Sequence, residues 1–446
     1  MQRRKGENKM LTGILIIAFM LLIMVLMVTR KMPTVIALLV LAIGVCIIAG
    51  IPFISKDAEG KEIGFLTTVL VSGATDLAAN FIIAIFAGWL ACIMDVAGIM
   101  RTMIKKGAEF GGDKVIVVHV ILYAVATLLM SVVTGLGGAI MIGTIVIPIL
   151  IAVGVDKMTA AISFLFAKGV GVTFALSNVN TYATMTGMDF DSVYQYSWII
   201  SGIAFAVGLA YIIIFDNKNG KKFAFSAPLK GEELEAAAEV KGVLGGLSML
   251  TPFIPPVLVA AVKFPIIPAL LIGILWATLM TCWKPGWKRT MNTLSKTFTE
   301  GFEKTAPAGC MMIVIGILLR AVKTAQVTTA LEPFMSAIAP GTVVTFLLFF
   351  IILAPLCLYR GPLNLWGLGA GICALFVGLS LLTPAQAMVG FVGVTVMQSI
   401  CCPTNTHNVW VAGYTGQEVT SITMKQLPFV WPAVAAMILV GTLLYT

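Results

Sequence analysis

Long apolar runs alternate with short polar breaks along this chain, and the lengths of the runs set the expected elements. Runs such as "LTGILIIAFMLLIMVLMV" (residues 11–28) and "TVIALLVLAIGVCIIAG" (34–50) approach the roughly 20 apolar residues that a helix needs to cross a bilayer. The pattern therefore predicts an all-α polytopic membrane protein.

The two halves of the chain show a similar order of runs and breaks. The expected elements of the first half are helices at about 11–29, 33–52 and 81–99, an amphipathic segment at 66–80, a re-entrant hairpin within 115–154, a broken helix at 158–188 and a last helix at 192–215. Those of the second half are helices at 247–262, 265–282 and 308–323, a hairpin at 341–381, a broken helix at 386–414 and a last helix at 425–445. The long polar stretch 216–246 is expected to link the halves.

Three pairs of similar segments indicate an internal duplication of residues 1–215 and 247–446. The pairs are "VTRKMPTVIALLVL" (28–41) with "VKFPIIPALLIGIL" (262–275), "GLGGAI" (135–140) with "GLGAGI" (367–372), and "GVTFALSNVNT" (171–181) with "GVTVMQSICCPTNT" (393–406). They occur in the same order in both halves. Each half then holds five full crossings and one hairpin, and an odd number of crossings makes the two repeats inverted, as in many secondary transporters.

The composition supports the membrane class and removes others. Hydrophobic residues make up 59% of the 446 residues and charged residues 11%, whereas a soluble domain carries about 25% charged residues. The net charge of +9 is typical of the basic loops of membrane proteins, so we expect no nucleic-acid partner. The eight cysteines lie mostly in apolar runs and are interpreted as small core residues, with neither a disulfide framework nor a zinc site.

Four polar or glycine-rich interruptions mark the expected site. Irregular backbone at membrane depth is tolerated where it lines a cavity or binds a ligand, and paired interruptions in two repeats point to a transport site. The interruptions are the hairpin tips "TGLGG" (134–138) and "YRGPLN" (359–364) and the helix breaks "SNVNT" (177–181) and "PTNTH" (403–407).

The side chains of these interruptions supply hydroxyl and amide groups. The candidate substrate ligands are Ser177, Asn178, Asn180, Thr181, Asn364, Thr404, Asn405, Thr406 and Asn408, with the backbone of Gly137 and Gly138. Oxygens of Ser177, Asn178, Thr404 and Asn405 could also hold a coupling sodium ion, because freed carbonyls in broken helices coordinate Na⁺. The alternative is that these side chains bond back to their own helices.

Three basic side chains fall within these elements, and no acidic residue does. Lys168 lies deep in the first broken helix, Arg360 at the second hairpin tip and His407 inside the second break. Ionisable residues inside a membrane are functional candidates by default, so the sequence predicts an anionic substrate, most simply a carboxylate on the guanidinium of Arg360. The alternatives are a snorkelling or neutral Lys168, a structural tie for Arg360, and a proton-carrying or merely hydrogen-bonding role for His407.

The remaining ionisable residues are expected to be structural. His119 lies on an apolar face and is interpreted as a hydrogen-bonded core residue, and Asp76 and Asp95 as scaffold or interface residues. Asp189 stands just beyond the first break. Glu300 and Glu303 are expected in a solvated amphipathic segment that parallels 66–80.

This architecture resembles the ion transporter superfamily, which includes gluconate permeases, citrate symporters and divalent-anion sodium symporters. The resemblance spans the whole chain and is strongest at 21–45, 88–99 and the two breaks. It implies a homodimer in which a fixed scaffold (11–99 and 247–323) supports mobile transport elements (115–188 and 341–414) that move as an elevator. "SNVNT" splits the family's Ser-Asn-Thr signature and "PTNTH" replaces its Ser by Thr, which leaves sodium and proton coupling open.

The sequence therefore predicts a symporter of a small organic anion, such as gluconate, citrate or a dicarboxylate, coupled to H⁺ or Na⁺ in the inner membrane of a prokaryote. The lipid bilayer is its expected surrounding, and no cofactor or enzymatic activity is expected. A sodium–proton or other cation antiporter that uses Asp76, Asp95 or Asp189 is the first alternative. A membrane enzyme built on Cys401, Cys402 and His407, or an ion channel, is a further alternative. The chain has no G-x-x-x-x-G-K-[ST] run, which argues against a self-contained ATP-driven pump.

Overall fold

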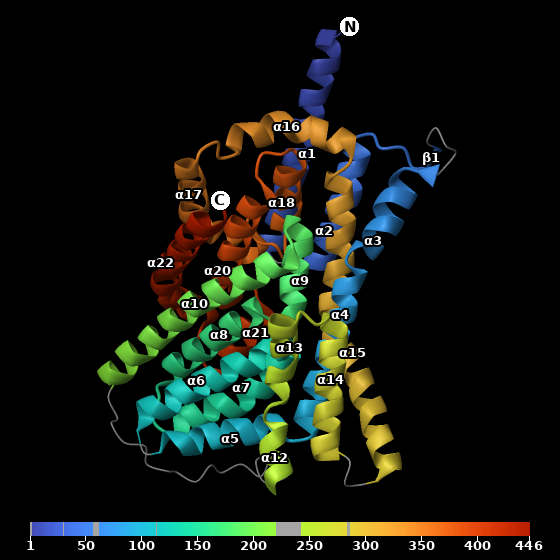
Figure 1. Ribbon diagram of the computed structural model, residues 1–446. Coiled ribbons are helices and arrows are strands. Elements are labelled where there is room, and N and C mark those ends of the chain that lie inside the picture. The colour runs from blue at the N-terminus through green and yellow to red at the C-terminus, as the bar shows by residue number, and fades with distance from the viewer. Residues whose placement is uncertain (1, 30, 57–61, 113, 220–241, 283–285) are drawn as a thin grey trace.

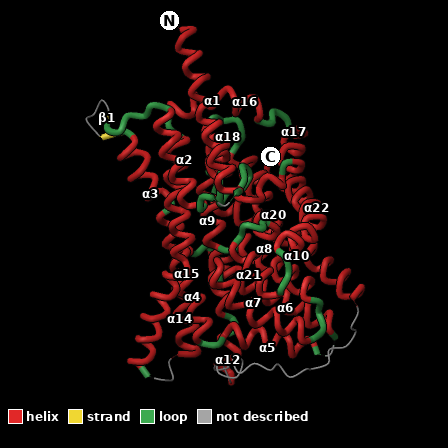
Figure 2. The backbone as a smooth tube through the Cα atoms, turned by 180° about the vertical axis from the view of Figure 1, so that it is seen from behind, coloured by secondary structure: helices red, strands yellow, loops and turns green. Residues whose placement is uncertain are grey.

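The chain folds almost wholly into helices (Figures 1 and 2). The computed structural model describes residues 2–29, 31–56, 62–112, 114–219, 242–282 and 286–446. Within these ranges nine helices are long and apolar enough to cross a membrane, or up to eleven if each of two bent pairs is one span. Two strands of two residues each form one small antiparallel pair, β1 (Ser55–Lys56) with β2 (Glu62–Ile63). The predicted class of an all-α polytopic membrane protein is confirmed.

The helices of both halves follow the predicted order, with additions. The first half contains α1 (Gln2–Val28), α2 (Thr34–Ile48), the π-helix η1 (Phe65–Val71), α3 (Ser72–Asp76), α4 (Ala78–Val96), α5 (Ile99–Gly111), α6 (Val115–Val132), α7 (Gly135–Ala152), α8 (Lys157–Thr173), α9 (Leu176–Thr186) and α10 (Phe190–Asn219). Most of the predicted linker 216–246 lies outside the described residues, and its first four residues belong to α10.

The second half begins with short helical pieces and ends with a long helix. It contains α12 (Gly242–Ser248), η2 (Thr251–Phe253), α13 (Ile254–Val262), α14 (Ile266–Ala277), η3 (Thr278–Cys282), α15 (Trp287–Val322), α16 (Ala325–Ile338), α17 (Val343–Ile352), η4 (Ala354–Arg360), α18 (Gly369–Gly378), α19 (Pro384–Ala387), η5 (Met388–Val392), α20 (Gly393–Cys401), α21 (Thr406–Thr415) and α22 (Val419–Tyr445).

Helices α4 and α15 run side by side through one side of the molecule, and the broken helices lie on the other side with α6, α7, α10 and α22 (Figure 1). Glycines bring the backbones of the first group together. A Cβ at Gly88 would lie 2.7 Å from the carbonyl oxygen of Gly301, and a Cβ at Gly73 would lie 2.7 Å from the Cα of Ile317, next to Gly316. Gly301 follows Gly73 by the same number of residues as Gly316 follows Gly88, so the glycine contacts have matched spacing in the two halves.

Two amphipathic helices, α5 and α16, were not predicted. Each follows the long scaffold helix of its half and precedes the hairpin, and the two lie at opposite ends of the molecule in Figure 1. On α5, Met100 and Ile104 are buried, whereas Lys106 is exposed. This spacing is the signature of a helix with one apolar face. The helices α5 and α16 were missed because their segments are too polar to be predicted as membrane spans.

Three predicted boundaries were wrong. Residues 66–80 do not form a separate segment, because η1 and α3 continue into α4 as one apolar stretch, Phe65–Val96. The helix expected at 308–323 is the end of α15, whose 36 residues give a length of about 54 Å at 1.5 Å per residue. The arms of the first hairpin, α6 and α7, have 18 residues each, which is longer than the short arms of a re-entrant hairpin predicted within 115–154. The arms of the second hairpin, α17 and α18, have 10 residues each.

Candidate functional site

Two broken helices cross in the interior, as the apolar runs with polar interruptions predict. The axis bends by 60° between α8 and α9, and a turn from Cys402 to Asn405, with extended backbone at both of these residues, separates α20 from α21. Every described residue of α20 is buried, and so is α8 from Thr159 onward. A Cβ at Gly169 would overlap Ile400, so glycine allows the two helices to cross directly beside Lys168.

Asparagine amides donate to carbonyls at the ends of the first half-helices. Asn178 Nδ2 donates to the carbonyl oxygen of Val172 (2.8 Å), and Asn405 Nδ2 donates to that of Gln398 (2.7 Å). In both breaks, therefore, an Asn at the start of the second half-helix bonds to the end of the first. The same amides have a structural role, because a buried carbonyl without a donor costs about 1–3 kcal/mol.

The second break is tied further by its own side chains. Gln398 Nε2 donates to Asn405 Oδ1 (2.7 Å), so both polar atoms of the Asn405 amide are engaged. Asn408 Nδ2 donates to the carbonyl oxygen of Ile400 (2.9 Å), while its Oδ1 is buried with no hydrogen-bond partner among the described residues. Thr404 Oγ1 lies 3.0 Å from Cys402 Sγ.

The inner half-helices begin without a side-chain cap. Neither Ala175 before α9 nor Asn405 before α21 offers a side-chain acceptor to the first turn. In contrast, Asp156 caps α8 by accepting from the N–H groups of Met158 (3.0 Å) and Thr159 (3.3 Å). The free N–H groups and the positive end of the helix dipole favour an anion at both inner termini.

Lys168, Arg360 and His407 gather at this crossing, although they come from three separate elements. Lys168 and Arg360 lie within electrostatic range of each other and of His407. Lys168 is 6% exposed and makes no hydrogen bond or ion pair with another described residue. His407 is buried, and its Nε2 lies 3.3 Å from the carbonyl oxygen of Ser399. No carboxylate within the described residues pairs with these groups.

The second hairpin presents Arg360 from a strained tip. Tyr359 and Arg360 have φ values of 54° and 62°, in the left-handed region that residues with side chains rarely adopt. Asn364 holds the turn, since its Nδ2 donates to the carbonyl oxygen of Cys357 (3.1 Å) and its Oδ1 accepts from the N–H of Trp366 (2.8 Å). Arg360 Nη1 donates to the carbonyl oxygen of Trp366 (3.1 Å), which leaves its other N–H groups for a ligand.

This tip contacts both breaks. The N–H of Tyr359 donates to Cys402 Sγ (3.2 Å) in the second break. The ring of Trp366 packs edge-on against that of Tyr182 on α9, with centroids 6.3 Å apart. The hairpin therefore closes over the crossing of α8 and α20.

The first hairpin tip lies elsewhere. A Cβ at Gly137 would contact the Lys304 side chain on α15, and one at Gly138 would meet Val133 of the same turn. The structure brings neither glycine into contact with Lys168 or Arg360, so their part in the site stays a prediction.

The remaining predicted ligands differ in whether their side chains already have hydrogen-bond partners. Ser177 is buried, and its hydroxyl has no partner among the described residues. Thr181 Oγ1 donates to the carbonyl oxygen of Ser177 (2.8 Å). Asn180 Nδ2 donates to Asn80 Oδ1 on α4, and Thr406 is exposed. Among the proposed sodium ligands, Ser177 and the Oδ1 atom of Asn178 keep unused oxygens.

Sequence reasoning missed Gln398, Cys402 and Asn80. Gln398 and Asn80 are buried polar side chains inside apolar helices, which is the signal that could have found them. Cys402 was counted as a core residue or an enzyme candidate, yet its sulfur accepts a hydrogen bond from the second hairpin.

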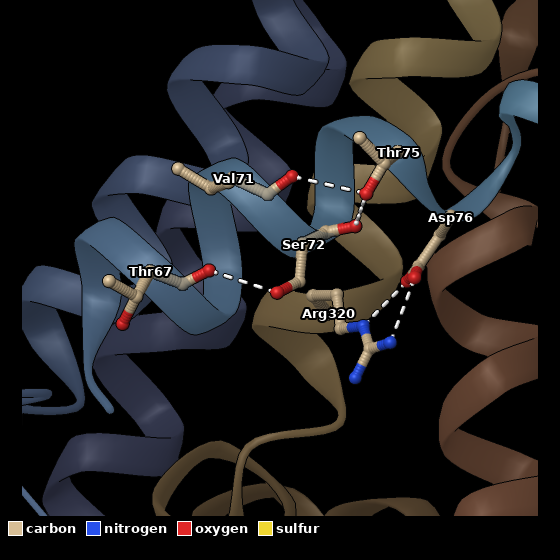
Figure 3. Close-up of polar contacts among 6 residues, drawn as sticks. All are labelled: Thr67, Val71, Ser72, Thr75, Asp76 and Arg320. Carbon is tan, nitrogen blue, oxygen red and sulfur yellow. Dashed lines mark hydrogen bonds and ion pairs between the residues drawn. The ribbon is translucent and has the colours of Figure 1, made fainter. Parts of the chain in front are cut away.

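The carboxylates considered for a cation antiporter lie away from the crossing. Asp76 accepts from Arg320 Nε (2.6 Å) and Nη2 (2.8 Å), which joins α3 to α15 (Figure 3). Asp95 lies within electrostatic range of Lys304. The N–H of Ser192 donates to Asp189 Oδ2 (2.8 Å) and holds the pKa of this carboxyl below its ordinary value.

The glutamates and His119 were expected to be structural. Glu300 pairs with Lys296 one turn earlier on α15 (3.7 Å), and Glu303 is exposed on the same helix. His119 is fully buried and hydrogen-bonded at both ring nitrogens, as the core interpretation requires.

Broken helices that cross in the interior, with a hairpin over them, distinguish this fold among helical membrane proteins. Among solved structures, the chain is similar to the YdaH transporter of Alcanivorax borkumensis, whose crystal structure is described as revealing an unusual topology. The similarity covers 97% of this chain and 99% of that chain with a TM-score of 0.60, at 13% sequence identity. No protein-family model and no curated protein matches the sequence. The chain thus shares the fold of a membrane transporter.

Proposed function

We propose that this protein is a secondary active transporter of a small organic anion, with the carboxylate held by Arg360 and Lys168. The observation that carries the proposal is that three basic side chains, without a paired carboxylate among the described residues, lie within electrostatic range of one another in a molecule whose two inner half-helices begin without a side-chain cap. Buried charges are paired in stable proteins because desolvation is costly. An anionic ligand supplies the missing partner.

The polar groups around the cations suit a hydroxylated or multivalent acid. The Ser177 hydroxyl and the buried Asn408 Oδ1 have no partner among the described residues. A hydroxyl of a sugar acid or hydroxy acid would donate to Asn408 Oδ1 and accept from Ser177. Gluconate, citrate and dicarboxylates are therefore the proposed substrates.

An elevator between inverted repeats is the proposed mechanism. Two features support the inversion: the matched spacing of the glycine contacts between α3–α4 and α15, and the placement of α5 and α16 at opposite ends of the molecule. Glycine contacts give the scaffold a closely packed spine against which the broken helices and hairpins could move. Membership of the ion transporter superfamily, a homodimer and a prokaryotic inner-membrane location belong to the same proposal.

Uptake into liposomes tests this function. The purified protein is reconstituted and offered labelled gluconate, citrate, succinate and lactate under imposed proton and sodium gradients. We expect one acid to accumulate in a gradient-dependent way. Arg360→Gln is expected to lower uptake at least tenfold, because each tenfold loss corresponds to about 1.4 kcal/mol of binding and a charged bidentate contact exceeds this.

A matched substitution separates charge at the site from charge elsewhere. Arg289, which is exposed on α15, is replaced by Gln in the control and is expected to leave uptake unchanged. One result would contradict the anion proposal and favour a cation antiporter: the unmodified protein takes up none of the acids, and it shows sodium-dependent proton movement that Arg360→Gln retains.

A further inference from the structure

A second polar centre lies in the first half, apart from the crossing of the broken helices. His119 Nδ1 lies 2.8 Å from Asp216 Oδ2, and His119 Nε2 lies 2.7 Å from Ser163 Oγ. The three residues come from α6, α10 and α8. The side chains of His119 and Asp216 are 0% and 7% exposed, and Ser163 is also buried.

The order Asp–His–Ser resembles the triad of hydrolases, but its burial rules out that use. The hydroxyl of Ser163 is enclosed, since the residue is 1% exposed, and no substrate carbonyl could reach it. A histidine that bridges a carboxylate and a hydroxyl in a membrane protein has a simpler use, which is to bind and release a proton.

The hydrogen bonds of Ser163 allow both protonation states. Ser163 Oγ also lies 3.1 Å from the carbonyl oxygen of Ala160, one turn earlier on α8. With a neutral imidazole, Nδ1–H donates to Asp216 and the Ser163 hydroxyl donates to Nε2. When Nε2 takes a proton, it donates to Ser163 Oγ, and the hydroxyl turns to donate to the carbonyl of Ala160.

Both states therefore leave the two imidazole nitrogens and the Ser163 hydroxyl hydrogen-bonded, and the change needs only the rotation of one hydroxyl. Without such an acceptor, protonation of a buried histidine would leave its second N–H unsatisfied at a cost of about 1–3 kcal/mol. From this geometry we infer that His119, with Asp216 and Ser163, is the proton-binding site that couples transport to a proton gradient.

Other ionisable groups lie around this centre. Asp216 is the carboxylate that faces the imidazole, and Tyr211 lies within electrostatic range of both Asp216 and Asp156. On α5, Gly111 packs against Val118 beside His119. Its charged side chains are Arg101, Lys105, Lys106 and Glu109, and no described ion pair joins Asp216 to a Lys or Arg.

Protonation changes the net charge of the His119–Asp216 pair. The pair carries one negative charge when His119 is neutral and no net charge when it is protonated. We include α10, which carries Asp216, in the part that moves with α6 and α8. Because moving an unpaired charge through a low-dielectric environment is costly, the protonated pair would then move more readily. Ser163 stands on the same helix as Lys168, which joins this centre to the anion site. This inference rests on the proposed anion transport, but its first test does not.

That test is spectroscopic and uses the fact that the chain has two histidines. The protein is labelled with ¹⁵N-histidine, and the His407→Gln variant leaves the imidazole signals of His119 alone. We expect these signals to shift reversibly between pH 5 and 9 in the folded protein. Asp216→Asn, which removes the carboxylate partner of Nδ1, is expected to change the response of these signals to pH. Signals that stay constant from pH 5 to 9 would overturn the inference.

The second test measures coupling in liposomes. His119→Gln is expected to lose at least tenfold of proton-driven uptake while it retains exchange of labelled for unlabelled substrate at equal pH. Thr127→Val, on the same helix, serves as the matched control and should keep both activities. Full proton-driven uptake in His119→Gln would refute the coupling role. If the unmodified protein transported no acid, the anion proposal would be contradicted instead. The spectroscopic test of His119 does not depend on that result.

Discussion

The two helix breaks use the same device but differ in what they leave free. In each, an asparagine amide bonds to a carbonyl at the end of the preceding half-helix: Asn178 to Val172, and Asn405 to Gln398. The second break then engages the other amide atom of Asn405 as well, whereas the first leaves Ser177 without a partner among the described residues. Similar sequence motifs therefore use their asparagines differently: the second break engages both polar atoms of Asn405 and leaves Asn408 Oδ1 free, whereas the first leaves the Ser177 hydroxyl and Asn178 Oδ1 free among the described residues.

The largest expected effect is on the stability of the protein and differs between the two asparagines. Asn405→Ala would leave the buried Gln398 Nε2 group without its partner and would remove one of two donors from the Gln398 carbonyl, which keeps the N–H of Cys402, at a cost of roughly 2–4 kcal/mol from one unsatisfied group and one further lost bond. Asn178→Ala loses one bond in a partly buried place and should cost about 1 kcal/mol. Thermal unfolding of both variants in detergent checks the difference. Equal losses of stability would show that the two breaks are structurally equivalent.

A smaller effect is expected where the two broken helices cross. Gly169→Ala places a methyl group against Ile400 and should destabilise the protein by about 1–3 kcal/mol, with a loss of uptake because Lys168 is displaced from the site. Adding Ile400→Ala removes the overlapping atoms and should restore part of both.

The control for this crossing is Gly202→Ala on α10, where a Cβ would meet nothing within 4 Å. It is expected to be neutral or slightly stabilising. If Gly169→Ala behaved like Gly202→Ala, the close crossing would be wrong.

The smallest effect concerns the helices that follow the breaks. Asp189 accepts from the N–H of Ser192 at the start of α10, whereas Glu418, before α22, bonds the hydroxyls of Thr420 and Ser421. Asp189→Ala should cost about 0.5–2 kcal/mol as a lost cap, at the low end because the carboxyl is exposed to solvent screening. Glu418→Ala should cost less.

The pH dependence of this cap has a definite sign. Folding lowers the pKa of Asp189, so its contribution is fully present above the unfolded value of about 3.9 and is lost as the pH falls through the lower folded value. Unfolding midpoints of Asp189→Ala and the unmodified protein should therefore begin to approach each other below about pH 4 and should coincide once the pH is below the folded pKa. A difference that stays constant as the pH falls below about 4 would mean that the carboxylate charge is not what caps α10.

Much of the site was visible in the sequence because hydrocarbon tolerates few exceptions. Polar residues such as Asn178 and Asn405 inside apolar runs had to lie at breaks, and the structure places them there. The basic residues Lys168, Arg360 and His407 were named from their depth in apolar elements. Their convergence was an expectation, since it depends on which helices cross.

Other features were not readable in this way. The helices α5 and α16 were missed because a search for apolar spans passes over helices with one polar face. The task of each asparagine was also hidden, because bonding back to a helix and binding a ligand use the same side chain. His119 was placed in the core correctly, but its partner Asp216 lies in the segment that had been taken as a linker.

The sequence by itself determined the solvent, the helices and the positions of the breaks, because each follows from short-range rules: run length, periodicity and the cost of an unpaired backbone group in hydrocarbon. Tertiary structure alone decided which breaks meet, which cations lie near one another and which amides are already engaged. These depend on contacts such as that of Gly169 with Ile400, which join residues far apart in the chain. No local pattern specifies such a pair, because its energy exists only once both helices are packed.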